Sequence, residues 1–298
     1  QRMQGSSAEL AGLLNIPVIL LVNAKSTAYS VAPMISGFKN FSPKVRIVGV
    51  VFNQVSSASD YQHLKAACQD VGVECLGYLP FSKDLKVPSR HLGLSLGAEK
   101  RMDEQIARTA ELIAHYVDLD RLLECCQTRW IEGKERSLGK GSLKIVVAKD
   151  AAFNFIYREN LEQLHRLGTV TFFSPLKGDD LPDADLVYLP GGYPELFAHR
   201  LQKHSQLMDA LREYAEQGGK ILAECGGMIY LSRSLTNRTG DKHYRMACVL
   251  PLDCTMEGAR LHLGYRKMFC KGNEWRGHEF HYSDVIQPDA LPSIAVQV

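Results

Sequence analysis

The sequence predicts an α/β protein built from two doubly wound domains, and three observations support this. Its 298 residues are enough for two domains of ordinary size. Short apolar runs alternate with amphipathic stretches through both halves, which is the strand and helix order of doubly wound folds. A charged, glycine-punctuated stretch near the middle separates the two series.

The first half predicts three strands and three helices. Ile16–Val22 is the clearest strand, because it carries no polar alternation and so resembles a parallel strand covered on both faces. The elements expected after it are a helix over Tyr29–Phe38, a strand over Val45–Phe52, a helix over Asp60–Asp70, a strand over Glu74–Leu79 closed by Pro80, and a helix over Glu99–Val117. We assign residues 1–127 to this domain and 128–142 to a linker.

The second half, residues 143–298, repeats the same order. Strands are expected over Leu143–Ala148, Val170–Phe173, Asp185–Leu189 and Lys220–Ala223, and helices over Arg158–Leu167, Leu207–Gln217 and Gly227–Leu235. Because parallel strands need helical crossovers, this alternation again indicates a sheet with helices on both faces.

Composition narrows the function classes. The net charge is +2, and no Lys and Arg block interleaves with aromatic residues, which argues against a nucleic-acid surface. The longest apolar run is too short to span a bilayer and no signal peptide opens the chain, so we expect a cytoplasmic protein. The eight cysteines lack metal-ligand spacing, which indicates free thiols in a reducing compartment and no metal site.

The most informative segment is Lys220–Leu231, where an apolar strand leads into Cys225, two glycines and a helix. This pattern is typical of a nucleophile elbow. The tight turn strains the backbone at the nucleophile, and the partial positive charge of the helix N-terminus is expected to favour a thiolate. The N–H that follows the cysteine can stabilise an oxyanion. Cys225 is therefore the candidate nucleophile and Gly226 a candidate oxyanion donor.

A second glycine pair follows another strand. Gly191 and Gly192 come after Pro190, where missing side chains expose N–H groups at the carboxyl edge of the sheet. Ligands of open α/β sheets bind at that edge. If the strands ending at Leu189 and Ala223 are neighbours, the two turns lie side by side. Gly191 and Gly192 are therefore the second set of candidate donors for an oxyanion.

These motifs resemble the class I glutamine amidotransferase domain of the cobyrinic and cobyric acid synthase family. Leu189–Glu195 and Ala223–Leu231 carry the resemblance at the glutamine site. Further matching segments are Gly5–Ala11, Val50–Val55, Leu76–Pro80, Ser89–Leu94, Ala152–Tyr157, Glu159–Leu161 and Arg276–Ser283. The resemblance thus covers nearly the whole chain.

The resemblance implies a partial dethiobiotin-synthetase-like ATPase domain in the first half and the amidotransferase domain in the second. In this family ATP, with Mg²⁺, phosphorylates a carboxylate of a corrin precursor, and ammonia from glutamine displaces the phosphate. The implied reaction amidates the a and c acetate side chains of cobyrinic acid in cobalamin biosynthesis. Cys225 would form a thioester with glutamine, and Asn53 and Pro80 match positions beside the nucleotide base.

The histidines are harder to assign. A cysteine nucleophile of this class needs a histidine base, and the resemblance places that base on a late strand beyond Val298. His281 is the best candidate within the chain. His278 lies three residues earlier on an apparent strand, so the two side chains should point to opposite faces. A structural or substrate-side role is favoured for His278, and His91 is a further substrate-side candidate.

No Gly-x-x-x-x-Gly-Lys-Ser/Thr phosphate loop occurs in the sequence. In the family this loop precedes the segment that begins at Gly5, so we expect productive ATP binding to need residues before the chain. Asn23 ends the first strand where many relatives carry an acidic residue. Gln1 opens the chain and Val298 closes it within an apparent strand, so we expect the parent protein to continue at both ends.

Two alternatives stay open. A nickel-sirohydrochlorin a,c-diamide synthase uses the same nitrogen donor, so the glutamine-site motifs do not exclude it. A non-catalytic amidotransferase-like binding module would explain the lack of a phosphate loop, with Cys225 as a small buried residue between ordinary turns. The intact elbow favours the enzyme. The expected partners are glutamine and a tetrapyrrole, with no nucleic acid and no membrane, and a homodimer is one option for the oligomeric state.

Overall fold

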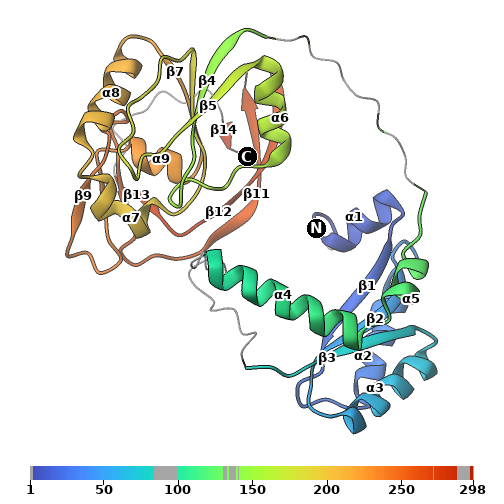
Figure 1. Cartoon of the computed structure of the whole chain (residues 1–298). Coiled ribbons are helices and arrows are strands. Elements are labelled where there is room, and N and C mark those ends of the chain that lie inside the picture. The colour runs from blue at the N-terminus through green and yellow to red at the C-terminus, as the bar shows by residue number, and fades with distance from the viewer. Residues whose placement is uncertain are drawn as a thin grey trace. The chain divides into compact units, whose positions relative to one another are not determined.

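The computed structural model describes residues 3–83, 99–129, 133, 139, 141–270, 272–286 and 296–297. The chain divides into two compact units, Gln1–Lys134 and Glu135–Val298 (Figure 1). The division falls inside the segment expected as a linker. Each unit contains a parallel sheet, which confirms the α/β class. No helix in these ranges is both long and apolar enough to cross a bilayer.

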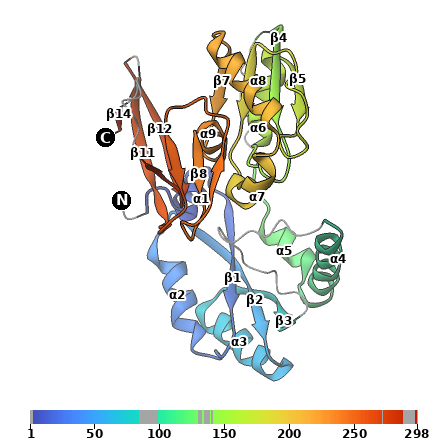
Figure 2. The ribbon, with the colours of Figure 1, turned by 90° about the vertical axis from the view of Figure 1, so that its left-hand side faces the viewer.

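The first unit is built on a three-stranded parallel sheet in the order β1-β2-β3 (Figure 2). Its strands and helices are α1 (Ser7–Leu14), β1 (Pro17–Asn23), α2 (Val31–Phe41), β2 (Arg46–Val55), α3 (Ala58–Val71), β3 (Glu74–Pro80), α4 (Glu99–Tyr116) and α5 (Leu119–Cys125). Ser57 begins α3 by accepting a hydrogen bond from Asp60 N, and Gly72 ends it in the left-handed conformation. The three strands and three helices expected here are all present.

Both faces of the central strand β2 are covered, whereas Leu21 of the edge strand β1 is 65% exposed, so the expectation that Ile16–Val22 is covered on both faces is wrong. Val50 and Phe52 of β2 point into a core with α2 and α3, which contribute Ile35 and Leu64. On the other face, Val51 packs with residues of β3, α4 and α5. A strand that is buried on both sides carries uninterrupted apolar residues, which explains why the sequence identified it.

The second unit contains a four-stranded parallel sheet in the order β5-β4-β6-β7. The elements of this part are β4 (Leu143–Ala148), α6 (Arg158–Leu167), β5 (Gly168–Phe173), β6 (Leu186–Leu189), α7 (Pro194–Leu201), α8 (Ser205–Glu216), β7 (Lys220–Ala223) and α9 (Gly226–Leu231). Helices α7, α8 and α9 pack on the face of Val187 and Leu189, and α6 packs on the face of Tyr188 (Figure 1).

Two further sheets complete the unit. Their strands are β8 (Ser234–Thr236), β9 (His243–Arg245), β10 (Asp253–Thr255), β11 (His262–Cys270), β12 (Asn273–His281), β13 (Asp284–Ile286) and β14 (Val296–Gln297). One sheet has the order β13-β10-β8-β9 and the other β12-β11-β14. The helix expected over Gly227–Leu235 is too long, because α9 stops at Leu231. Ser232 ends it by donating its hydroxyl to Ile229 O, and Leu235 belongs to β8.

Candidate active site

The chain reverses sharply between β7 and α9. Strand β7 ends at Ala223, and Cys225 adopts φ 46° and ψ −108° before the helix begins at Gly226. A positive φ is uncommon for a residue with a side chain and marks local strain, which clusters at functional sites. The first turn of α9 is closed by Met228 N–H, which donates to Cys225 O at 3.0 Å. The strand–turn–helix geometry expected from the sequence is therefore present.

The two glycine turns lie side by side, as expected. Strands β6 and β7 are parallel neighbours, and their last residues, Leu189 and Ala223, are register partners. A Cβ added at Gly191 would lie 3.4 Å from Cys225 Cβ. A Cβ at Gly226 would lie 3.0 Å from Gly192 O and 3.1 Å from Gly192 N. Backbone groups separated by more than thirty residues in sequence thus converge on one thiol.

The turn after β6 is fixed by backbone hydrogen bonds from a neighbouring loop. The carbonyl of Gly191 accepts from Asn154 N at 3.1 Å and from Phe155 N at 3.0 Å. Tyr193 N donates to Ala152 O at 3.0 Å. These contacts engage the carbonyl of Gly191, and the N–H of Gly192 remains directed at Cys225.

Opposing effects act on the pKa of the Cys225 thiol. The backbone N–H groups of Gly226 and Gly192 hydrogen-bond it and lower its pKa. Burial of the thiol has the larger effect, and the carboxylates of Glu195 and Glu224 add to it, so the net pKa is raised above its ordinary value. The N–H at the start of α9 thus favours the thiolate, as the sequence predicts, but burial and the two carboxylates outweigh it in the net pKa.

Glu224, next to the nucleophile, already has a partner. Tyr188 in β6 donates its hydroxyl to Glu224 Oε2 at 2.5 Å. The Tyr188 side chain is almost wholly buried in the core shared with α6. This hydrogen bond therefore ties the elbow to the neighbouring strand.

Two residues at the start of α7 were not singled out from the sequence, although both lie within the motif Leu189–Glu195. Tyr193 is only 4% exposed, and its ring packs edge-on against Phe155 with centroids 5.0 Å apart. Its hydroxyl has no hydrogen-bond partner within the described ranges. Glu195 is half-buried, and burial raises the pKa of its carboxyl to about 7. The signal was present as a Tyr and a Glu directly after the glycine turn.

The candidate histidines lie in a different sheet from the elbow. His281 ends β12 opposite His262 of β11, and their rings stack with centroids 4.8 Å apart. His281 Nδ1 lies 2.9 Å from Ser283 O. His278 is paired across the strands with Tyr265. In the part of the chain that the structure describes, no hydrogen bond joins either candidate to Cys225, and His91 lies outside the described residues.

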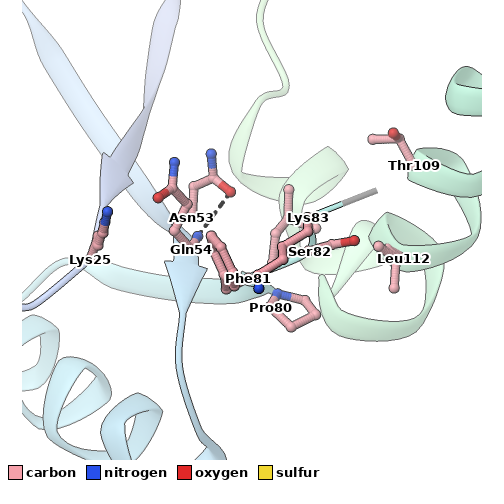
Figure 3. Close-up of a pocket in the computed structure, with 10 residues that line it drawn as sticks. Lys25, Asn53, Gln54, Pro80, Phe81, Ser82, Lys83, Thr109 and Leu112 are labelled. Atoms are coloured by element: carbon pink, nitrogen blue, oxygen red, sulfur yellow. Dashed lines mark hydrogen bonds between the residues drawn. The ribbon is translucent and has the colours of Figure 1, made fainter. Parts of the chain in front are cut away.

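The first unit has a cavity of about 870 Å³ at the carboxyl edge of its sheet (Figure 3). It is lined by Lys25, Asn53, Gln54, Leu79, Pro80, Phe81, Ser82, Lys83, Thr109 and Leu112. Asn53 and Gln54 at the end of β2 lie between Lys25 on one side and Pro80 with Phe81 on the other (Figure 3). The Gln54 N–H donates to Asn53 Oδ1 at 2.9 Å.

This cavity joins the two residues that the resemblance placed beside the nucleotide base. An Asn amide and a Pro–Phe surface can receive a planar base, and the lysines supply positive charge for an anion. No group of three or more His, Cys, Asp or Glu side chains among the described residues could hold a metal ion.

The model of the CobB/CobQ-like glutamine amidotransferase domain matches residues 144–298. The chain is 36% identical to the cobyrinate a,c-diamide synthase of Caldanaerobacter subterraneus subsp. tengcongensis, over 95% of this chain and 65% of that protein. It is 38% identical to the Priestia megaterium protein of the same name, over 94% of this chain and 64% of that protein. It is 37% identical to the hydrogenobyrinate a,c-diamide synthase of Brucella abortus, over 96% of this chain and 68% of that protein.

The chain thus spans about two thirds of the length of these relatives. The matched domain contains the elbow at Cys225 and the adjoining turn at Gly191 and Gly192. Likeness to the three relatives extends beyond that domain into the first unit, since it covers nearly the whole chain. From the motifs, the paired turns and these matches, the chain belongs to the CobB/CobQ-like glutamine amidotransferase family.

Proposed function

We propose that this chain forms the glutamine-hydrolysing domain, and part of the nucleotide-binding domain, of an ATP-dependent a,c-diamide synthase acting on cobyrinate. One observation carries the proposal: the Cys225 thiol, on a strained turn, is hydrogen-bonded by two backbone N–H groups from neighbouring turns. A structural cysteine in an apolar core has no need of either feature.

In the proposed glutamine reaction, Cys225 Sγ attacks the side-chain amide carbon of glutamine. The carbonyl oxygen becomes an oxyanion, which Gly192 N–H and Gly226 N–H are placed to stabilise. The C–N bond then breaks, the nitrogen leaves as ammonia after gaining a proton, and a thioester remains. Water hydrolyses the thioester to glutamate and returns the thiol. Attack also needs a base that takes up the proton of the Cys225 thiol.

The cavity of the first unit would hold the nucleotide. Asn53 Nδ2 can donate to a base edge, Pro80 and Phe81 can cover its face, and Lys25 can face negative charge. ATP bound there, with Mg²⁺, would supply the phosphoryl group that turns a substrate carboxylate into a leaving group for ammonia. The relatives are named for a,c-diamide synthesis, which supports two acetate carboxylates of a tetrapyrrole as the groups amidated.

A second question within this proposal is whether cobyrinate or hydrogenobyrinate is the substrate. The relative named for hydrogenobyrinate is 37% identical to the chain, and those named for cobyrinate are 36% and 38% identical. We favour cobyrinate because two of the three relatives described above carry that name. A comparison of the two acids as substrates decides between them.

The test uses the full-length protein that carries this chain, with cobyrinate, ATP and Mg²⁺. Cys225→Ser should abolish amidation supported by glutamine and leave amidation supported by ammonium chloride within about threefold of wild type, because only the nitrogen supply is lost. An electrophilic glutamine analogue should label Cys225 before any other cysteine. Product formation followed by mass spectrometry gives both rates.

Cys248 provides a matched control. It is exposed, lies in the same unit and also has a positive φ, of 56°, but no glycine pair follows it. Cys248→Ser should leave both reactions unchanged. Equal loss of the glutamine and ammonium reactions in Cys225→Ser would assign Cys225 a structural role and refute the proposal.

A further inference from the structure

Two carboxylates act on the Cys225 thiol, and they differ in their own contacts. Both Glu195 and Glu224 raise the pKa of Cys225 through their charge. Glu224 accepts the hydroxyl of Tyr188 at 2.5 Å. The Glu195 carboxylate receives only the N–H of its own residue and has no ion pair within the ranges that the structure describes. One of the two carboxylates therefore remains available to a ligand.

The position of Glu195 is fixed by the packing of α7 against the elbow. Pro194 opens this eight-residue helix, and its Cδ lies 2.7 Å from where a Cβ on Gly226 would be. The next residue is Glu195, so its backbone is held one residue from that contact. Its charge also acts on Tyr193, which in turn feels the charge of Cys225. The three side chains thus share one small region.

Tyr193 gives an independent indication that a ligand belongs here. The side chain is 96% buried, yet its hydroxyl makes no hydrogen bond among the described residues. Leaving a buried hydroxyl unpaired is destabilising, because the group loses its hydrogen bonds to water and gains none in the protein. Phenylalanine would fill the same space against Phe155 without that cost. A hydroxyl kept at this position is explained if bound ligand supplies the missing partner.

We propose that Glu195 binds the α-ammonium group of the glutamine donor, and that the Tyr193 hydroxyl pairs with the same amino-acid end. This inference rests on the proposed function, because it assumes that glutamine is held with its amide carbon at Cys225. A free carboxylate close to the thiol is the complement of the one positive group that glutamine carries. The elbow binds the reacting amide, and Glu195 and Tyr193 identify the substrate as an amino acid.

The test compares glutamine with glutaramate, which has the same amide and carboxylate but lacks the α-amino group. In the full-length protein, wild type should prefer glutamine, because a site built to bind a charged group rejects the analogue lacking it. Glu195→Gln should lower kcat/KM for glutamine about 10- to 100-fold, mostly through KM. For glutaramate the change should stay within about threefold, because there is no ammonium group to lose. Ammonia release measures both reactions.

Further variants separate recognition from structure. Glu195→Asp should retain part of the preference for glutamine over glutaramate that Glu195→Gln loses. Tyr193→Phe should lower that preference several-fold and leave the fold intact. Glu213→Gln, on the exposed side of α8, serves as the matched control and should change neither substrate. Equal loss for glutamine and glutaramate in Glu195→Gln would overturn this inference. Hydrolysis of both substrates by Cys225→Ser would instead overturn the proposed function itself.

Discussion

Replacing Gly226 with alanine tests the glutamine site with a single methyl group. Its Cβ would lie 2.7 Å from Pro194 Cδ and about 3 Å from the backbone of Gly192, as close as 3.0 Å at the carbonyl oxygen. Carbon atoms prefer separations of about 3.5–4.0 Å, so relief requires a movement of roughly 1 Å. The rigid proline ring at the start of α7 limits where that movement can go. The turn at Gly192 is therefore pushed away from the thiol of Cys225.

The expected effect on glutamine hydrolysis is large, because the movement withdraws one of two N–H donors. Loss of a single oxyanion donor lowers kcat about 10²- to 10³-fold. The overpacking itself costs about 1–3 kcal/mol, which lowers Tm by a few degrees for a unit of this size. Amidation supported by ammonium should stay near the wild-type rate.

The assay measures glutamine-supported and ammonium-supported amidation together with thermal unfolding. Gly37→Ala, in α2, is the control, since a Cβ there would meet nothing within 4 Å. Full glutamine activity in Gly226→Ala would show that the Gly192 N–H is not needed. A parallel loss of both activities would show that the turn supports the fold and not the glutamine reaction.

Three further predictions concern titration and anchoring. The pKa of Glu195 is raised from 4.5 to about 7, so its contribution to stability is present below pH 4.5 and is lost as the pH rises through 7. Glu195→Gln should therefore stabilise the protein at pH 8 by on the order of 1 kcal/mol, after allowance for partial exposure, and little at pH 4; a Tm difference independent of pH would contradict this. Alkylation of Cys225 by iodoacetamide, followed by peptide mass spectrometry, should still accelerate above pH 9, because its pKa is raised; a plateau below pH 8 would count against it. Tyr188→Phe leaves Glu224 without its donor and should cost about 1–2 kcal/mol in urea unfolding, an expectation that an unchanged midpoint would exclude.

The sequence predicted the parallel sheets and the meeting of the two glycine turns because both follow from local patterns. Strands such as β2 are apolar on both faces, and the carboxyl ends of neighbouring parallel strands meet at one edge. The end predicted for α9, at Leu235, was wrong for a related reason. Leu235 continues the apolar pattern of the helix, although it lies in the buried strand β8, and periodicity does not distinguish the two over so short a segment.

The protonation of Cys225 was beyond sequence reasoning, since it depends on groups that only folding brings together. Glu195 lies thirty residues earlier and reaches the thiol through the packing of α7 on the elbow. The motif after the glycine turn contains Tyr193, but its unpaired hydroxyl is a property of the packed state that the sequence does not show. His281 likewise could be placed on a strand, but its stacking against His262 depends on the pairing of β11 with β12, which no local pattern predicts.

The pairing of Leu189 with Ala223 separates the geometry of the site from the length of the chain between them. Helices α7 and α8 occupy most of that interval, and residues could be inserted at the loop between them without altering which strand ends face each other. A deletion inside β6 or β7 would disrupt the sheet, because a register shift of one residue turns every side chain of the strand to the opposite face. The loop after α7 is thus the natural place to graft a tag or a reporter, whereas the two short strands tolerate no change in length.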